Sequence, residues 1–142
     1  MKLKIKKLVE DAIIPDYKTA GAAGMDLYAA ESVLLPPNSR TLVSTGIAIE
    51  LEPGYEAQLR ARSGLASKHG ISLSNGVGTI DEDYRGEVKV PIFNSSPDLF
   101  ALAKGERIAQ MVINKYEKAE IEVVAELSDT DRAEGGFGST GK

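Results

Sequence analysis

The chain has 142 residues, of which 42% are hydrophobic, and a formal net charge of −4, which suits a single globular domain with its own core. It contains no cysteine, which excludes disulfides and thiolate metal sites, and its negative charge argues against non-specific nucleic-acid binding. No apolar run approaches the length of a membrane span and the N-terminus lacks a signal-peptide core, so we expect a cytoplasmic protein with no membrane or nucleic-acid partner.

Alternating side chains predict short strands along the chain. Apolar and polar residues alternate at positions 2–6, 47–51 and 120–123, which is the period of a half-buried strand. Clusters of turn-forming residues separate such runs at positions 36–39, 52–54 and 94–98. Short strands between turns predict an all-β fold, a jelly-roll-like β-sandwich or barrel.

One carboxylate interrupts an early apolar run. Asp26 lies within the sequence GMDLYAA, which is typical of a strand. Burying a carboxylate is costly unless it is paired or serves an ion. Asp26 is therefore either the structural partner of a cation or part of a Mg²⁺ site. Mg²⁺ needs only one or two carboxylates when substrate phosphates supply much of its coordination.

Residues 63–70 depart from the strand pattern. Ser63 is a plausible N-cap and Gly70 a plausible stop, which predicts about two helical turns. Arg62, Ser63 and Gly64 at the start of this helix suit an anion, because helix N-termini present unpaired N–H groups. The alternative is that Ser63 only caps the helix. His69 is the single histidine and the chain has no cysteine, so we expect no metal-ligand role for it.

Residues 75–86 (NGVGTIDEDYRG) indicate a hairpin of two glycine-containing strands around an acidic turn. A base lying against such strands could be read by main-chain N–H and C=O groups. Asp81 directly follows Ile80 at a strand end, so we expect it to be partly buried, and we expect Asp83 to be an exposed turn residue. An ordinary acidic turn is the alternative.

The last fifteen residues (SDTDRAEGGFGSTGK) contain one large apolar side chain, Phe137. Such a segment cannot bury enough surface to fold alone, but its aromatic ring and glycines suit stacking on a flat ligand, and its hydroxyls and arginine suit phosphate oxygens. We therefore predict a β domain over 1–127 and a flexible lid over 128–142, with a disordered terminus as the alternative. Residues 136–142 match the spacing of a P-loop but lack its preceding strand and following helix.

Taken in order, five segments resemble the five motifs of the trimeric dUTPase family: AGMDLYAA, RSGLA, NGVGTIDEDYRG, KGERIAQMV and RAEGGFGSTG. The matches run from Ala23 to Gly141, nearly the whole chain. The resemblance implies a jelly-roll homotrimer with active sites at subunit interfaces, which hydrolyses dUTP to dUMP and pyrophosphate with Mg²⁺.

The resemblance also implies roles for individual residues. Asp81 would activate the water that attacks the α-phosphorus, and Asp26 would act through metal-bound water. The phosphates would be held by Arg62, Ser63, Gly64 and Gln110. Uracil would be read by Asn75 and by the main chain of Thr79, Ile80 and Lys89, while Tyr84 would pack on the deoxyribose and exclude a 2′-hydroxyl. The lid would use Arg132, Phe137, Gly138, Ser139 and Thr140.

Two positions depart from the family pattern. Ala61 stands where proline is usual, and Ala133 stands where glycine is usual, which bears on the flexibility of the tail. The nearest alternative is a dCTP deaminase, which shares the fold but releases ammonia, and the arginine–phenylalanine–glycine tail argues against it. The other alternative is a nucleotide-sensing or protein-binding module without turnover. The presence of both Asp26 and Asp81 counts against that module.

Overall fold

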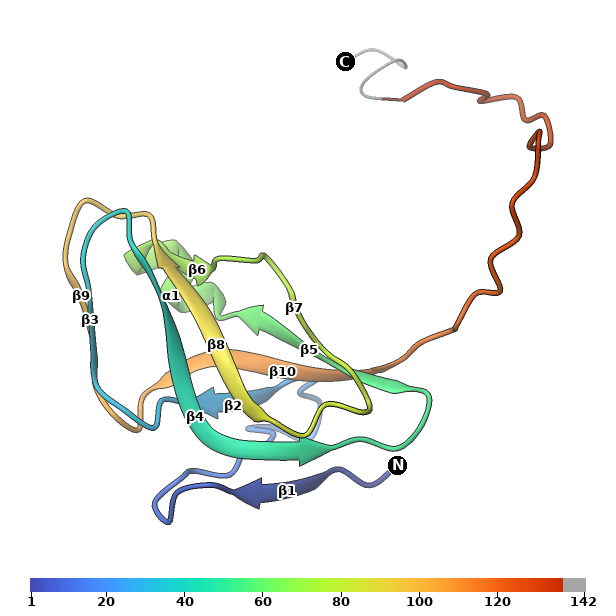
Figure 1. Ribbon diagram of the computed structural model, residues 1–142. Coiled ribbons are helices and arrows are strands. Elements are labelled where there is room, and N and C mark those ends of the chain that lie inside the picture. The colour runs from blue at the N-terminus through green and yellow to red at the C-terminus, as the bar shows by residue number, and fades with distance from the viewer. Residues whose placement is uncertain (137–142) are drawn as a thin grey trace.

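The computed structural model describes residues 1–136, which form ten strands and one short helix (Figure 1). In chain order the elements are β1 (Lys4–Lys7), β2 (Met25–Tyr28), β3 (Val33–Leu35), β4 (Arg40–Glu50), β5 (Tyr55–Ala61), α1 (Ser63–His69), β6 (Ile71–Leu73), β7 (Gly78–Ile80), β8 (Glu87–Asn94), β9 (Phe100–Leu102) and β10 (Arg107–Lys115). That helix, α1, is too short to cross a membrane, and the described residues contain no other.

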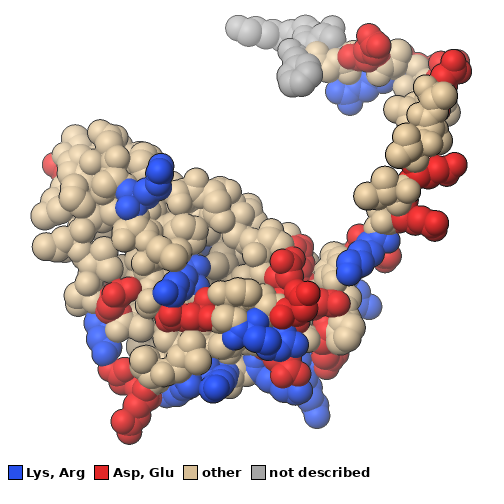
Figure 2. All heavy atoms as spheres, in the orientation of Figure 1, with Lys and Arg blue, Asp and Glu red and all other residues tan. Residues whose placement is uncertain are grey.

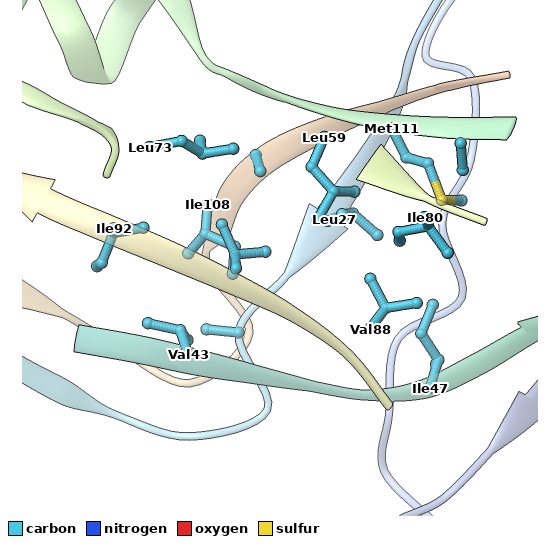
Figure 3. Packing of buried hydrophobic residues seen from close by; sticks show 14 of the residues in the cluster. Leu27, Val43, Ile47, Leu59, Leu73, Ile80, Val88, Ile92, Ile108 and Met111 are labelled. Atoms are coloured by element: carbon cyan, nitrogen blue, oxygen red, sulfur yellow. The ribbon is translucent and has the colours of Figure 1, made fainter. Parts of the chain in front are cut away.

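The strands form two four-stranded antiparallel sheets, ordered β1-β4-β8-β6 and β2-β10-β5-β7, and a two-stranded sheet of β3 and β9. Strand β8 shows why the chain folds this way, because every second residue from Val88 to Asn94 is buried while the residues between them are not. Side chains from both large sheets meet in one core that includes Leu27, Val43, Ile92 and Met111 (Figure 3). The predicted all-β sandwich with one short helix is confirmed.

Strand β4 changes register at a bulge between Ser44 and Ala48, and Gly46 lies within it. Gly46 has φ +70°, in the left-handed region that favours glycine. Its C=O accepts a hydrogen bond from the Leu8 N–H (2.8 Å), and its N–H donates to the Glu87 carboxylate (2.9 Å). The bulge therefore links the N-terminal segment to the start of β8.

The short helix lies where the sequence predicted it, but its cap differs. Arg62, with an extended backbone (φ −83°, ψ 127°), is the N-cap residue, and no side chain caps the helix. The prediction that Ser63 is the cap is wrong, because the extended backbone ends at Arg62 and Ser63 is already the first helical residue. The stop at Gly70 is confirmed by its left-handed conformation, with φ 64°.

The predicted hairpin over residues 75–86 is also wrong. Strand β7 pairs with β5, whereas β8 pairs with β4 and β6, so the two strands belong to different sheets. Each buries its own apolar residues, Ile80 and Val88, from opposite sides of the sandwich core. Residues 81–86 therefore cross from one sheet to the other.

After β10 the chain leaves the sandwich, and residues 117–136 extend away from it (Figure 1). The predicted strand over 120–123 is wrong for this chain, because the segment pairs with no strand among residues 1–136. Ile121 is 89% exposed and Val123 is 94% exposed. The boundary between 127 and 128 stays a prediction.

A candidate nucleotide site in two halves

One half of the site is a pocket of about 320 Å³ at the crossing from β7 to β8. Apart from the lid, it brings together the residues predicted to contact the base and sugar and the predicted catalytic carboxylate: Asn75, Thr79, Ile80, Asp81, Tyr84 and Lys89. We call it the base-side half. Its volume falls within the range usual for small-molecule pockets.

The main chain of β7 is placed to read a flat ligand. This strand is the last in its sheet and pairs only with β5, through Ile80 opposite Ala57 and Thr79 opposite Gln58. An edge strand presents a row of unpaired N–H and C=O groups. These groups on β7 are therefore available to a flat ligand, and the reading of a base by them stays a prediction.

Asp81 lies at the end of β7 and is exposed in the single chain. The expectation that it is partly buried is wrong, because the strand stops at Ile80 and the chain turns outward. Its C=O accepts a hydrogen bond from the Tyr84 N–H (3.1 Å), which closes the turn. Asp83 is exposed in this turn, as predicted.

The loop that carries Asp81 is tied to the end of the sandwich through Glu82. The Gly54 N–H donates to the Glu82 carboxylate (2.5 Å), and this bond is the main reason why the pKa of Glu82 is lowered. The Tyr116 hydroxyl also lowers the pKa of Glu82 and has its own pKa raised by Glu82. Acidic side chains gather here, where residues 117–136 leave the sandwich (Figure 2).

The other half of the site is built around Asp26 on β2, and Asp26 is only 4% exposed. Arg107 Nη1 donates to Asp26 Oδ2 (3.0 Å), and Arg62 Nε lies 3.7 Å from Oδ1. Arg62 Nη1 also donates to the C=O of Arg107 (3.1 Å). We call this the phosphate-side half. Asp26 is thus the partner of two cations, one of the two roles that the sequence left open.

Sequence reasoning missed Arg107. The signal was present, because a buried Asp26 needs a cation and Arg107 precedes Gln110 by three residues in the same motif. What the sequence did not give is the pairing of β10 with β2, which places Arg107 opposite Tyr28 and Gln110 opposite Asp26.

The remaining residues predicted to bind phosphates surround this ion-paired cluster. Gln110 is exposed and lies between Asp26 and Arg60 across neighbouring strands, so the three share one sheet face. Ser63 and Gly64 are exposed at the start of α1, where the Ser63 hydroxyl makes no capping bond. A side chain at Gly64 would meet open space. That Arg62, Ser63, Gly64 and Gln110 hold one anion together stays a prediction.

The two halves lie apart in a single chain. Asp26 is on one edge strand of the sheet β2-β10-β5-β7 and Asp81 follows the other, so three strand spacings, about 14 Å, separate them laterally. Arg62 directly follows β5, five residues beyond Ala57, which is paired with Ile80, and five extended residues span about 16 Å. One chain therefore does not bring Asp81 to Arg62 and Asp26.

The predicted lid residues Phe137, Gly138, Ser139 and Thr140 lie outside the described residues. Arg132 is exposed on the segment that leaves the sandwich, and its Nε donates to the Gly135 C=O (2.7 Å). Next to it, Ala133 has φ 42°. Alanine thus adopts the left-handed conformation at the position where the family resemblance leads us to expect glycine.

A model of the dUTPase family matches residues 10–141. The chain belongs to the dUTPase family. It is 58% identical to the deoxyuridine 5′-triphosphate nucleotidohydrolase of Nautilia profundicola over 142 residues, which cover both chains completely. It is 57% identical to that of a Hydrogenobaculum species, with 99% of each chain covered. A solved structure of Staphylococcus bacteriophage 80alpha dUTPase (G164S mutant with dUpNHpp) has a TM-score of 0.89 at 29% identity, with 99% of each chain covered.

These likenesses make the sandwich a dUTPase jelly roll and the protein a dUTP nucleotidohydrolase, a hydrolase of nucleotide metabolism. The recognition from five ordered motifs is confirmed. The dCTP deaminase and the module without turnover are set aside, since the family match and the curated relatives agree on a dUTP-hydrolysing enzyme.

Proposed function

We propose that this dUTPase converts dUTP to dUMP and pyrophosphate by attack of water on the α-phosphorus, at sites shared between copies of a homotrimer in the cytoplasm. The observation that carries the proposal is the division of the site, because the base-side half of one copy needs the phosphate-side half of another. Apposing the two halves at an interface places a nucleoside next to Asp81 and its triphosphate next to Arg62.

In the base-side half, uracil pairs with the main chain of Thr79, Ile80 and Lys89 and with the Asn75 side chain. The ring of Tyr84 packs on the deoxyribose and leaves no room for a 2′-hydroxyl. A dUTP-like ligand is supported by the bacteriophage 80alpha relative, whose solved structure contains dUpNHpp.

Asp81 acts as the general base. Its carboxylate is open to solvent beside the pocket, so it can accept a hydrogen bond from a water near the α-phosphorus. The water oxygen forms a bond to phosphorus, its proton passes to Asp81, and the bond from phosphorus to the bridging oxygen breaks, releasing pyrophosphate. Positioning of this kind is worth about 10²- to 10⁴-fold in rate.

Mg²⁺ fits the phosphate-side half as an ion held mainly by the substrate. Within residues 1–136, no group of three or more acidic or histidine side chains could cage a metal. Asp26 offers one carboxylate, enough to hold a water of an ion that keeps several waters and binds phosphate oxygens. When bound, the ion would neutralise charge on the triphosphate. Arg62, Ser63, Gly64 and Gln110 hold the phosphates themselves.

The extended C-terminal segment supports assembly and a lid. Ile121, Val123 and Leu127 are each more than 85% exposed in the single chain, so they need a partner surface. The twenty residues 117–136 can span at most about 70 Å, enough to reach a neighbouring copy. Residues 128–142 then close over the nucleotide, with Arg132 on the phosphates and Phe137 on the base.

The energetics make this lid depend on the triphosphate. Ordering about five residues costs on the order of 5–10 kcal/mol. One stacked base returns about 1–3 kcal/mol and each charge-assisted hydrogen bond about 1.5–3 kcal/mol. Several such bonds are needed, so closure follows binding of dUTP and relaxes after cleavage.

The experiment is Asp81→Asn, with Asp83→Asn as the matched control in the same loop. We expect Asp81→Asn to lower kcat on dUTP by about 10²- to 10⁴-fold while binding of dUpNHpp by calorimetry is kept. Asp83→Asn should leave kcat nearly unchanged. Near-normal turnover of Asp81→Asn would refute the role of Asp81.

A further inference from the structure

The ring of Tyr84 lies directly on the backbone of Gly86. A Cβ atom built at Gly86 would lie 2.3 Å from Tyr84 Oη, 2.5 Å from Cζ and 2.9 Å from Cε2. These distances are too short for any side chain at residue 86 while the ring stays in place. The missing side chain is therefore a condition for the observed position of the ring.

Two further contacts hold the same residue. Tyr84 Oη donates to the C=O of Glu87 (3.0 Å), and the Tyr84 N–H donates to the C=O of Asp81 (3.1 Å). Glu87 is the first residue of β8, so the tip of the ring is fixed to the sandwich itself. Tyr84 is thus held by hydrogen bonds at its hydroxyl and at its backbone N–H, and its ring packs against Gly86.

The backbone does not require glycine at this position. Among residues 1–136, the glycines with positive φ are Gly46, Gly54, Gly70, Gly76 and Gly105, and Gly86 is not one of them. Alanine at residue 86 would therefore fit the local backbone, and the three nearest atoms that its Cβ would meet all belong to Tyr84. The contact with the ring is what glycine provides here.

We propose that Gly86 is a specificity-determining positioning residue of this dUTPase, acting through the ring of Tyr84. The proposal rests on the proposed role of Tyr84 in reading the sugar. A methyl group at residue 86 forces the hydroxyl end of the ring to move by about 1 Å to reach ordinary contact distance. That shift moves the ring from its observed position against the sugar, so the ring no longer excludes a 2′-hydroxyl.

The test compares Gly86→Ala with wild type by pyrophosphate release on dUTP and on UTP. We expect the ratio of kcat/KM for dUTP to that for UTP to fall at least about tenfold, since misplacement by 1 Å can cost about 100-fold. Gly21→Ala is the matched control, because a Cβ there meets open space in a remote turn, and its ratio should equal that of wild type.

Variants at residue 84 separate this inference from the proposed function. Tyr84→Ala should lower the ratio as Gly86→Ala does, and the double variant should match Tyr84→Ala within about twofold, because the clash is gone. The double variant also remains informative if Gly86→Ala folds poorly. Tyr84→Phe keeps the ring on Gly86, so its ratio of kcat/KM for dUTP to that for UTP should stay close to that of wild type.

Each contrary result has one meaning. An unchanged ratio in Gly86→Ala, together with a lowered ratio in Tyr84→Ala, overturns the inference about Gly86 and leaves the role of Tyr84 intact. An unchanged ratio in Tyr84→Ala overturns both. A Tyr84→Phe variant as unselective as Tyr84→Ala assigns the position of the ring to its hydrogen bond and rejects Gly86.

Discussion

Replacing Arg107 by methionine should destabilise the protein, because it removes the closest cation from a buried carboxylate. Asp26 is 4% exposed, and its nearest cationic nitrogen is Arg107 Nη1 at 3.0 Å. Methionine keeps most of the apolar stem, so the loss reports on the charge.

The expected loss of stability depends on the burial of Asp26 and on the cation that remains beside it, Arg62. Breaking a buried ion pair costs about 3–5 kcal/mol because one charge is left unpaired. The side chain of Arg107 is 45% exposed and Arg62 remains 3.7 Å away, and both facts reduce the loss. We expect about 2–3 kcal/mol, which corresponds to a fall in Tm of about 6–12 °C for a chain of this length.

The assay is thermal unfolding at one fixed protein concentration, since assembly makes Tm depend on concentration. Arg40→Met, at the exposed start of β4, is the control and should cost less than about 0.5 kcal/mol. The double variant Asp26→Asn with Arg107→Met should recover more than half of the loss, because it removes the unpaired charge.

Two results would refute this reasoning. One is a Tm for Arg107→Met within about 1 °C of the Arg40→Met control. The other is a double variant whose loss is simply the sum of the two single losses, which would mean that Asp26 and Arg107 do not interact.

Three further predictions concern other regions. Gly46→Ala should lower the free energy of unfolding, measured by chemical denaturation, by about 2–4 kcal/mol. The reason is that residue 46 has φ +70° and the new Cβ would lie 2.6 Å from Val9 Cγ2. A loss no larger than that of Gly21→Ala would contradict this. The lowered pKa of Glu82 means that its stabilising contribution is present above its ordinary value of 4.5 and is lost as the pH falls through the folded-state pKa. The difference in Tm between wild type and Glu82→Gln should therefore shrink below pH 4.5, and a constant difference would show that the ionised carboxylate is not responsible. Truncation after Leu127 should leave a folded protein, by circular dichroism, with kcat on dUTP lowered at least about tenfold, and full activity would reject the lid.

Local patterns predicted the strand-rich fold because alternation and turn chemistry act over a few residues. They predicted that residue 26 needs a cation for the same reason, since burial of the surrounding apolar run is visible in the sequence. Gly70 was predictable as a helix stop because the left-handed conformation is a property of that one residue.

The failures share a different cause, which is that pairing between distant strands is not a local property. Residues 75–86 look like one hairpin, yet the strands that flank residues 81–86, β7 and β8, each pair with a longer strand in a separate sheet. Residues 120–123 alternate like a strand, yet in the single chain they pair with no strand among residues 1–136. Arg107 was missed because its register against β2 is set by tertiary pairing.

The distance between Asp81 and Arg62 within one chain has a genetic consequence. Under the proposed assembly, a copy with a substitution at Asp81 inactivates the site to which it contributes its base-side half, even when the neighbouring copies are intact. Conversely, a copy damaged only at Asp81 and another damaged only at Arg62 can together rebuild some whole sites. Alleles of such an enzyme can therefore inactivate or complement one another inside a mixed oligomer.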